Sequence, residues 1–320
     1  MASRYPEIDL RRLKTTRISD RLSTVGTDQF AKPLDPDSSV REFLDSLPDI
    51  LAGRSLRTLV QRIVGARRLG KPVILAMGAH VIKCGLGPII VDLIRGGVIT
   101  AVATNGAGAI HDSEVALFGA TSEDVSDALP SGTFGTAKET AEFVNGCASR
   151  ACRESMGFGE ALGKVLCEVR APHAGLSVLA AAYESNIPVT VHVSIGCDIV
   201  HMHPSADGAA IGECTHRDFR ILTQAMSDLG QGGVLLNIGS AVVLPEVILK
   251  ALAVLVNLGY DLSDMLGANL DFIQQYRSNK QVVERVREIG GSGISIIGHH
   301  ELLIPLIAAG VKSTMSLASG

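Results

Sequence analysis

The 320-residue chain lacks tryptophan and has few other aromatic residues, with 8 phenylalanines and 4 tyrosines. Its six cysteines form no C-x-x-C pair and show none of the spacings of a disulfide-rich secreted domain, so we expect reduced thiols. No apolar run reaches the roughly 18 uninterrupted residues of a membrane span. The first residues also lack the apolar core of a signal peptide. These absences predict a soluble, cytoplasmic protein.

Strong charge of either sign is also missing. The formal net charge is −4, and both signs are scattered along the chain. The sequence therefore has no basic stripe for nucleic acid and no polybasic patch for a membrane surface. One basic run, DLRRLKTTRISDR at residues 9–21, favours a solvated arm or a subunit contact over nucleic-acid binding.

Glycine and aliphatic residues are abundant, with 34 glycines and 46% hydrophobic residues. From residue 55 onward, helical patterns of about 10 to 17 residues alternate with short apolar runs. Five strands are expected, at residues 71–78, 98–108, 187–195, 232–240 and 293–298. This alternation predicts an α/β protein whose mostly parallel sheet has helices on both faces. We divide the chain into an N-terminal arm, residues 1–50, and one domain, residues 51–320.

Every unusual polar cluster follows an expected strand. The clusters are GAHVIKCG (78–85), TNGAGAIHD (104–112), IGCDIVHMHP (195–204), NIGSA (237–241) and GHHE (298–301). In open parallel sheets, ligands bind at the carboxyl ends of the strands. We therefore expect these clusters to line one ligand-binding edge.

Two of the clusters suggest contacts to an anion. TNGAGAIHD has a G-x-G pattern, with His111 where a dinucleotide fingerprint has its third glycine. It fits either a phosphate site at a helix N-terminus or a tight turn. In GAHVIKCG, Lys83 fits a phosphate or carboxylate contact, a desolvated nucleophile, or a solvated loop lysine.

The histidine clusters allow three interpretations. His201 and His203 follow one expected strand, and His299 and His300 precede Glu301 after another. If the first segment is extended, its two imidazoles point to the same side, as two metal ligands would. The same groups fit acid–base or hydrogen-bonding roles toward a polar ligand. They also fit structural roles, such as Glu301 near a helix N-terminus. We favour the ligand-facing role and assign no metal ligands.

Four segments together resemble deoxyhypusine synthase. They are residues 72–112, 177–198, 232–252 and 293–309, and the resemblance in order and spacing covers roughly residues 55–310. It implies a Rossmann-like doubly wound fold, NAD bound at the strand ends, a polyamine-type amine substrate, and a homotetramer with active sites between subunits. The cofactor residues implied by position are Gly78, Ala79, His80, Lys83, Thr104, Asn105, Gly106, Ala107, Gly108, Gly239 and Ser240.

The candidate acids or bases, judged from the residues themselves, are His201, His203, His299 and His300. By position, Asp198 resembles an acidic residue of the family and is the candidate orienting or cation-binding carboxylate. The nucleophilic lysine of the family follows a Trp-Gly pair, which this chain lacks. Lys280, the only lysine in the matching region, is the candidate for this role, although it lies several residues too early. Pro245 and Glu246 stand where the family has a histidine. We therefore expect a divergent, NAD-dependent enzyme that performs transfer or oxidation on an amine. The alternatives are a metal-dependent enzyme that uses the four histidines and a non-catalytic nucleotide-binding module.

Overall fold

The computed structural model describes residues 3–315. The first two residues of the predicted arm and the last five residues of the predicted domain lie outside the described residues. One six-stranded sheet has the order β3-β2-β1-β4-β5-β6, and all neighbouring strands are parallel. The strands are β1 (Val73–Met77), β2 (Ala101–Asn105), β3 (Val189–His192), β4 (Val234–Ile238), β5 (Leu266–Asp271) and β6 (Ser292–Ile297). This is the strand order of the Rossmann fold. The predicted fold class is confirmed.

Alternate residues of each strand face opposite sides of the sheet, because the side-chain period of a strand is two. In β1, Val73, Leu75 and Met77 belong to one core cluster, while Ile74 and Ala76 belong to the other. All five residues of β1 are buried. The continuous apolar run that predicted a strand covered on both faces is therefore explained by two packed helix layers.

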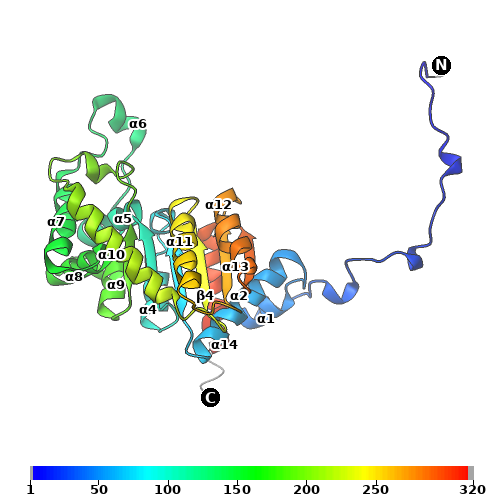
Figure 1. Ribbon diagram of the computed structural model, residues 1–320. Coiled ribbons are helices and arrows are strands. Elements are labelled where there is room, and N and C mark those ends of the chain that lie inside the picture. The colour runs from blue at the N-terminus through cyan, green and yellow to red at the C-terminus, as the bar shows by residue number, and fades with distance from the viewer. Residues whose placement is uncertain (1–2, 316–320) are drawn as a thin grey trace.

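Helices cover both faces of the sheet, as Figure 1 shows. The first face carries α2 (Leu51–Arg68), α4 (Gly87–Arg95), α5 (Gly106–Phe118), α9 (Val178–Glu184) and α14 (His300–Met315), with α7 (Lys138–Glu154) and α8 (Phe158–Glu168) beside α5. The second face carries α10 (Gly208–Met226), α11 (Val243–Asn257), the π-helical η7 (Asn279–Glu284) and α13 (Arg285–Glu288). Short helices are α1 (Val40–Ser46), α3 (His80–Lys83), α6 (Val125–Ala128) and α12 (Tyr276–Ser278).

Six short 3-10 helices lie in the arm and the loops. They are η1 (Leu10–Arg12), η2 (Ile18–Asp20), η3 (Thr27–Gln29), η4 (Leu129–Ser131), η5 (Ala174–Leu176) and η6 (Ile199–Met202). The last of them, η6, lies in the predicted histidine cluster after β3, where the sequence suggested an extended segment.

The sheet contains one more strand than the sequence predicted. The additional strand, β5, has the sequence LGANLD and lies between β4 and β6. Its glycine and asparagine interrupt the apolar run on which the other strands were recognised. All six of its residues are buried, since tertiary packing overrides a weak local preference for strand.

The N-terminal segment projects away from the domain (Figure 1). Before Gln29 its hydrogen bonds join residues close in sequence. It meets the body where the Gln29 carbonyl accepts from Asp49 N–H and Lys32 N–H donates to the Ser46 carbonyl. Helix α1 already belongs to the body, because Leu44 is buried in the first core cluster. The free part of the arm therefore ends before α1.

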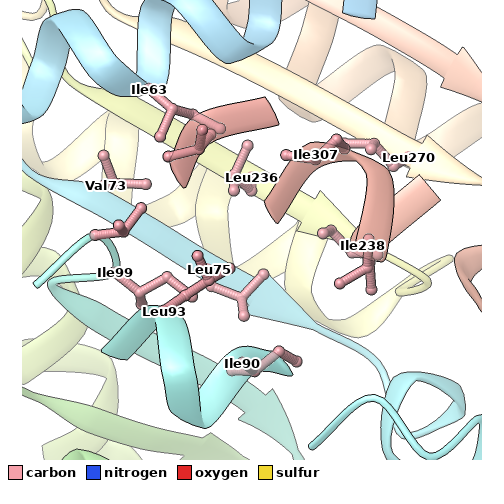
Figure 2. A pocket seen from close by; sticks show the side chains of 13 residues that line it. Ile63, Val73, Leu75, Ile90, Leu93, Ile99, Leu236, Ile238, Leu270 and Ile307 are labelled. Carbon is pink, nitrogen blue, oxygen red and sulfur yellow. The ribbon is translucent and has the colours of Figure 1, made fainter. Parts of the chain in front are cut away.

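A small cavity lies within the first core layer, between the sheet and helices α2, α4 and α14 (Figure 2). Its volume is about 30 Å³, and its lining is entirely aliphatic, with Leu75, Ile238 and Ile307 among the thirteen residues. A water there would find no hydrogen-bonding partner, so such a cavity stays dry. It belongs to the packing of the core, and we exclude it as a candidate functional site.

Candidate functional site

The point where the strand order reverses lies between β1 and β4. Gly78 N–H donates to the Ile238 carbonyl, so the loops that leave these two strands are in direct contact. Gly239 adopts a φ of +65°, and a Cβ there would lie 2.7 Å from Cε1 of His300. Only glycine fits this left-handed, crowded position. The predicted residues after β1, β4 and β6 therefore do meet at one edge.

The histidine pairs do not meet. His201 and His203 follow β3, whereas His299 and His300 follow β6, and these two strands are the opposite edges of the sheet. Parallel strands lie about 4.8 Å apart, so the two edges are roughly 24 Å from each other. The four histidines therefore do not form the single cluster that the metal-dependent alternative uses. Within residues 3–315, no group of three or more His, Cys, Asp or Glu side chains is placed to hold a metal ion.

A pocket of about 440 Å³ opens at the carboxyl ends of β2 and β3. That volume is in the usual range for sites that bind small molecules. Three carboxylates, from Glu114, Glu123 and Asp198, line it together with Lys83 and His111. The remaining lining residues are Ala107, Ile110, Ser122, Val125, Phe134, Ala137, Cys197 and Ile199. We call this space the acidic pocket.

Asp198 lies directly against the start of α5. A Cβ at Gly106 would come within 1.9 Å of its Oδ2, so the glycine leaves room for the carboxylate. Burial raises the pKa of Asp198, while His201, the Ala107 N–H and His111 lower it. Its negative charge is favourable at a helix N-terminus. The anion position that the G-x-G pattern suggested is thus occupied by a residue of the chain itself.

His201 holds the loop that carries Asp198. Its Nδ1 accepts hydrogen bonds from Gly196 N–H at 3.1 Å and Asp198 N–H at 3.2 Å. Because Nδ1 accepts, the ring proton is on Nε2, which lies 3.9 Å from Oδ2 of Asp198. His203 instead contacts Ser205 Oγ through Nδ1 at 2.8 Å. The two imidazoles have different local partners and do not form the same-sided pair of an extended segment.

Glu114 is held in its ionised form by its neighbours. Burial by itself raises the pKa of this carboxyl, but hydrogen bonds from His111, Thr121 and Thr140 together bring it below its usual value. The Thr140 hydroxyl donates to Glu114 Oε1 at 2.9 Å. Glu123 lies at the exposed rim, where Oε2 accepts from Gly135 N–H at 2.8 Å. Among residues 3–315, Lys83 forms no ion pair, so its ammonium group can meet an anionic group in the pocket.

Helix α3 separates the acidic pocket from a second cluster. Lys83 faces the pocket, whereas His80 Nε2 lies 3.3 Å from Cys84 Sγ. Burial and the neighbouring Glu301 carboxylate raise the pKa of Cys84. Since the thiolate is the nucleophilic form of cysteine, this thiol is suited to hydrogen bonding rather than covalent attack at neutral pH.

His300 is the buried member of the second cluster, packed against Gly239, His80 and Phe272. It is 1% exposed, and neither ring nitrogen has a hydrogen-bond partner among the described residues. Nε2 lies 3.6 Å from Asp271 Oδ1, which accepts from Phe272 N–H. Burial lowers the pKa of His300, and the Asp271 carboxylate opposes this. The ring is therefore a neutral imidazole with one donor and one acceptor to offer.

Several predicted site residues make structural contacts. Thr104 Oγ1 donates to the Met77 carbonyl at 3.1 Å, and Asn105 Oδ1 caps α5 by accepting from Gly108 N–H at 2.9 Å. Ser240 Oγ accepts from Leu244 N–H at 3.2 Å at the start of α11. Lys280 pairs with Glu284, which raises the pKa of the lysine. A protonated amine is a poor nucleophile. Lys280 is not among the residues that line the acidic pocket.

The sequence did not single out Asp271 and Phe272, because they end a strand that the apolar pattern did not reveal. The alternation of Asn269 and Asp271 within an otherwise apolar stretch was the available signal. Glu114 and Glu123 were missed for another reason. They come from a helix and a loop that approach Asp198 only through tertiary packing, such as that of α5 against β3.

The strand order, the contact at the point of reversal and the polar carboxyl edge define a Rossmann-type doubly wound protein. Among solved structures, it is similar to AgrE in a ternary complex with ornithine and NAD⁺, at 15% identity and a TM-score of 0.51. That match covers 84% of this chain and 34% of AgrE. A likeness at this identity shows a shared fold.

Two other structures are similar with lower TM-scores. A LOR/SDH protein from Methanococcus maripaludis S2 has 14% identity and a TM-score of 0.49, covering 88% of this chain and 74% of that one. An Entamoeba histolytica protein provisionally identified as a deoxyhypusine synthase has 12% identity and a TM-score of 0.48, covering 89% and 97%. This chain spans about a third of the length of AgrE and of the cyanobacterial arginine dihydrolase ArgZ. No protein-family model matches the chain, and no curated protein matches it in sequence.

No described helix is both long and apolar enough to span a membrane.

Proposed function

We propose that the protein is a cytoplasmic, NAD-dependent enzyme that performs transfer or oxidation on a small amine, as a divergent relative of the deoxyhypusine synthases. The observation that carries the proposal is the acidic pocket beside a Rossmann-type carboxyl edge. Carboxylates bind ammonium groups, so three of them in one pocket favour a cationic amine. The amine-binding neighbours of the same fold, AgrE with ornithine or with L-arginine, support the same class of substrate.

The residues at the edge fit a dinucleotide. The close approach of Gly78 to Gly239 leaves backbone rather than side chains at the point of strand reversal. Around it, His80 and His299 offer polar groups, and His300 has two unpartnered ring nitrogens. Bound there, NAD supplies a hydride acceptor. The protein binds and orients the amine and provides a side chain that accepts a proton from it.

The residues of the acidic pocket divide these tasks. Glu114, kept ionised by its hydrogen bonds, and Glu123 attract the ammonium group. Asp198 lies deepest against α5, and because burial raises its pKa it is the carboxylate best suited to accept a proton. Lys83 can hold a carboxylate if the substrate has one, as an amino acid does.

The decisive experiment is a calorimetric titration of NAD into the purified protein, followed by spermidine or L-ornithine with NADH absorbance recorded. Binding of NAD together with NADH formation would support the proposal. NAD binding without turnover on either amine would favour a non-catalytic nucleotide-binding module. A folded protein that binds no NAD would overturn the proposal.

Removing carboxylates from the acidic pocket is expected to weaken amine binding. Asp198→Asn and Glu123→Gln should each raise the Kd of the better-bound amine about tenfold or more, the usual effect of losing a hydrogen bond to a charged group. Glu123 lies at the exposed rim, so its variant tests the charge without disturbing the loop. The control is Glu142→Gln, an exposed carboxylate on α7 outside the pocket. Equal amine affinity in wild type and both pocket variants, by calorimetry, would place the substrate elsewhere.

We further propose that the arm, residues 1–50, serves the assembly of a homotetramer, while residues 51–320 carry the site. The arm exposes its large apolar side chains, among them Ile8, Leu10, Leu13, Ile18 and Leu22. Residues 1–25 hold six basic and three acidic side chains, whereas the rest of the chain holds 23 basic and 30 acidic. The arm thus has both apolar area and opposite charge with which to bind another copy.

Shortening the chain to residues 32–320 is expected to reduce the mass of the assembly. Size-exclusion chromatography with light scattering should show a tetramer for the full chain and a smaller species for the shortened one. Leu22→Asp in the full chain should act in the same direction, and Thr16→Asp is the control for added charge. A full chain that runs as a monomer, or a shortened chain that remains tetrameric, would contradict this role of the arm.

A further inference from the structure

Four rings form a cluster at the carboxyl ends of β1, β5 and β6, which we call the ring cluster: Phe272, His80, His299 and His300. Phe272 is its centre, with ring centroids 5.8 Å from His80, 6.4 Å from His299 and 6.0 Å from His300. The planes of Phe272 and His299 are within 7° of parallel. Three of the nine histidines of the chain therefore lie in this cluster.

The rim of the ring cluster is open. Phe272 is 45% exposed, and the side chain of His299 is 70% exposed. His80 is also exposed. Aromatic faces left in water at a strand end offer a stacking surface, and a planar heteroaromatic ring is the ligand that covers such faces best.

The floor of the ring cluster supplies a second, independent sign of a ligand. His300 is 1% exposed, yet neither ring nitrogen has a hydrogen-bond partner among the described residues. Its ring stands edge-on to His80 and to Phe272, with a centroid 5.5 Å from that of His80. A buried polar group without a partner is costly, and native structures explain it by a ligand or a bound water.

We infer that the ring cluster is the subsite that stacks a planar heteroaromatic ring of the bound dinucleotide, with His300 hydrogen-bonded to the exocyclic nitrogen or oxygen of that ring. The inference rests on the proposed function for the identity of the ligand. Two rings of NAD share this chemistry, since adenine carries an amino group and nicotinamide a carboxamide. The position beside Gly239 places the subsite at the point of strand reversal, across α3 from the acidic pocket.

The test compares three probes, NAD, AMP and nicotinamide mononucleotide, by calorimetry on the full chain. Phe272→Ala is expected to raise the Kd of NAD about 5- to 100-fold, the usual effect of losing one stacking face. Phe272→Leu keeps apolar area and removes the ring, so it should weaken binding as well. Ile273→Ala is the matched control, because this neighbour is also exposed and apolar but has no ring. The mononucleotide that weakens in parallel with NAD identifies the stacked ring.

The outcomes separate the inference from the proposed function. If NAD binds the wild type and both Phe272 variants equally, the inference is overturned and the proposed function stands. If the wild type binds no NAD, the proposed function fails and the subsite fails with it. Loss of NAD affinity in His299→Ala as well as in Phe272→Ala, with unchanged thermal unfolding, would support stacking over a general effect on the loop.

Discussion

Asp218→Ala is expected to destabilise the protein by about 2 to 6 kcal/mol, since it leaves two buried backbone N–H donors without an acceptor, at about 1 to 3 kcal/mol each. Asp218 is completely buried on α10, where Oδ2 accepts from Gly159 N–H at 3.0 Å and Val191 N–H at 2.7 Å. It joins the first turn of α8 to β3. Burial raises its pKa to about 8, although backbone N–H groups, including that of Phe158, lower it.

The measurement is urea unfolding of wild type, Asp218→Ala and Asp218→Asn. The asparagine keeps one acceptor oxygen at nearly the same volume, so its loss of stability should be smaller. Asp228→Ala is the control, because this exposed carboxylate pairs with Lys71 at the surface, and it should cost about 1 kcal/mol or less. An Asp218→Ala variant as stable as the control would show that the carboxylate does not anchor β3.

Acid is expected to destabilise the protein through His192, the last residue of β3. This imidazole is 4% exposed, and burial lowers its pKa from the ordinary value of 6.5 to about 4. Its folded pKa is thus below its unfolded pKa. The neutral ring therefore contributes stability that is present above pH 6.5 and lost as the pH falls through 4. The full loss amounts to about 3 kcal/mol.

The experiment follows the free energy of unfolding against pH for wild type and His192→Gln. The contribution of Asp218, whose pKa is raised, changes in the opposite direction and falls as the pH rises toward 8. It is present in both proteins, so the difference between the two profiles isolates the contribution of His192. His216→Gln is the control, since that histidine is exposed on α10. Parallel profiles for wild type and His192→Gln between pH 6.5 and 4 would count against a buried, neutral histidine. Both tests concern β3, whose carboxyl end positions the loop of Asp198.

The candidate site was predictable in outline. Each polar cluster chosen from the sequence does follow a strand of the parallel sheet, so the prediction of a polar carboxyl edge holds. The roles of individual residues were less accessible. Thr104 and Ser240 looked like ligand contacts but bond to backbone groups of the sheet and of α11. Whether a hydroxyl at a strand end faces a ligand or a neighbouring carbonyl depends on residues far away in sequence.

Local sequence was sufficient for the strands with continuous apolar runs, such as VILAM in β1, and for most helices of the domain. A strand that is buried on both faces has a continuous run of aliphatic residues, and such a run can be recognised from the local sequence alone. Strand β5 was not predicted from the sequence, because a strand with this glycine and asparagine is stabilised only by its pairing with β4 and β6.

Strand order was decided by packing between distant segments. It places β3 and β6 at opposite edges, and so it separates the two histidine pairs that looked equivalent in the sequence. The same packing brings Asp271 and Phe272 to His300, and Glu114 and Glu123 to Asp198. The physical reason is that the direction of each crossover depends on which face receives the connecting helix. Which face receives each helix depends on packing throughout the core, and these contacts produce no periodic pattern in the sequence.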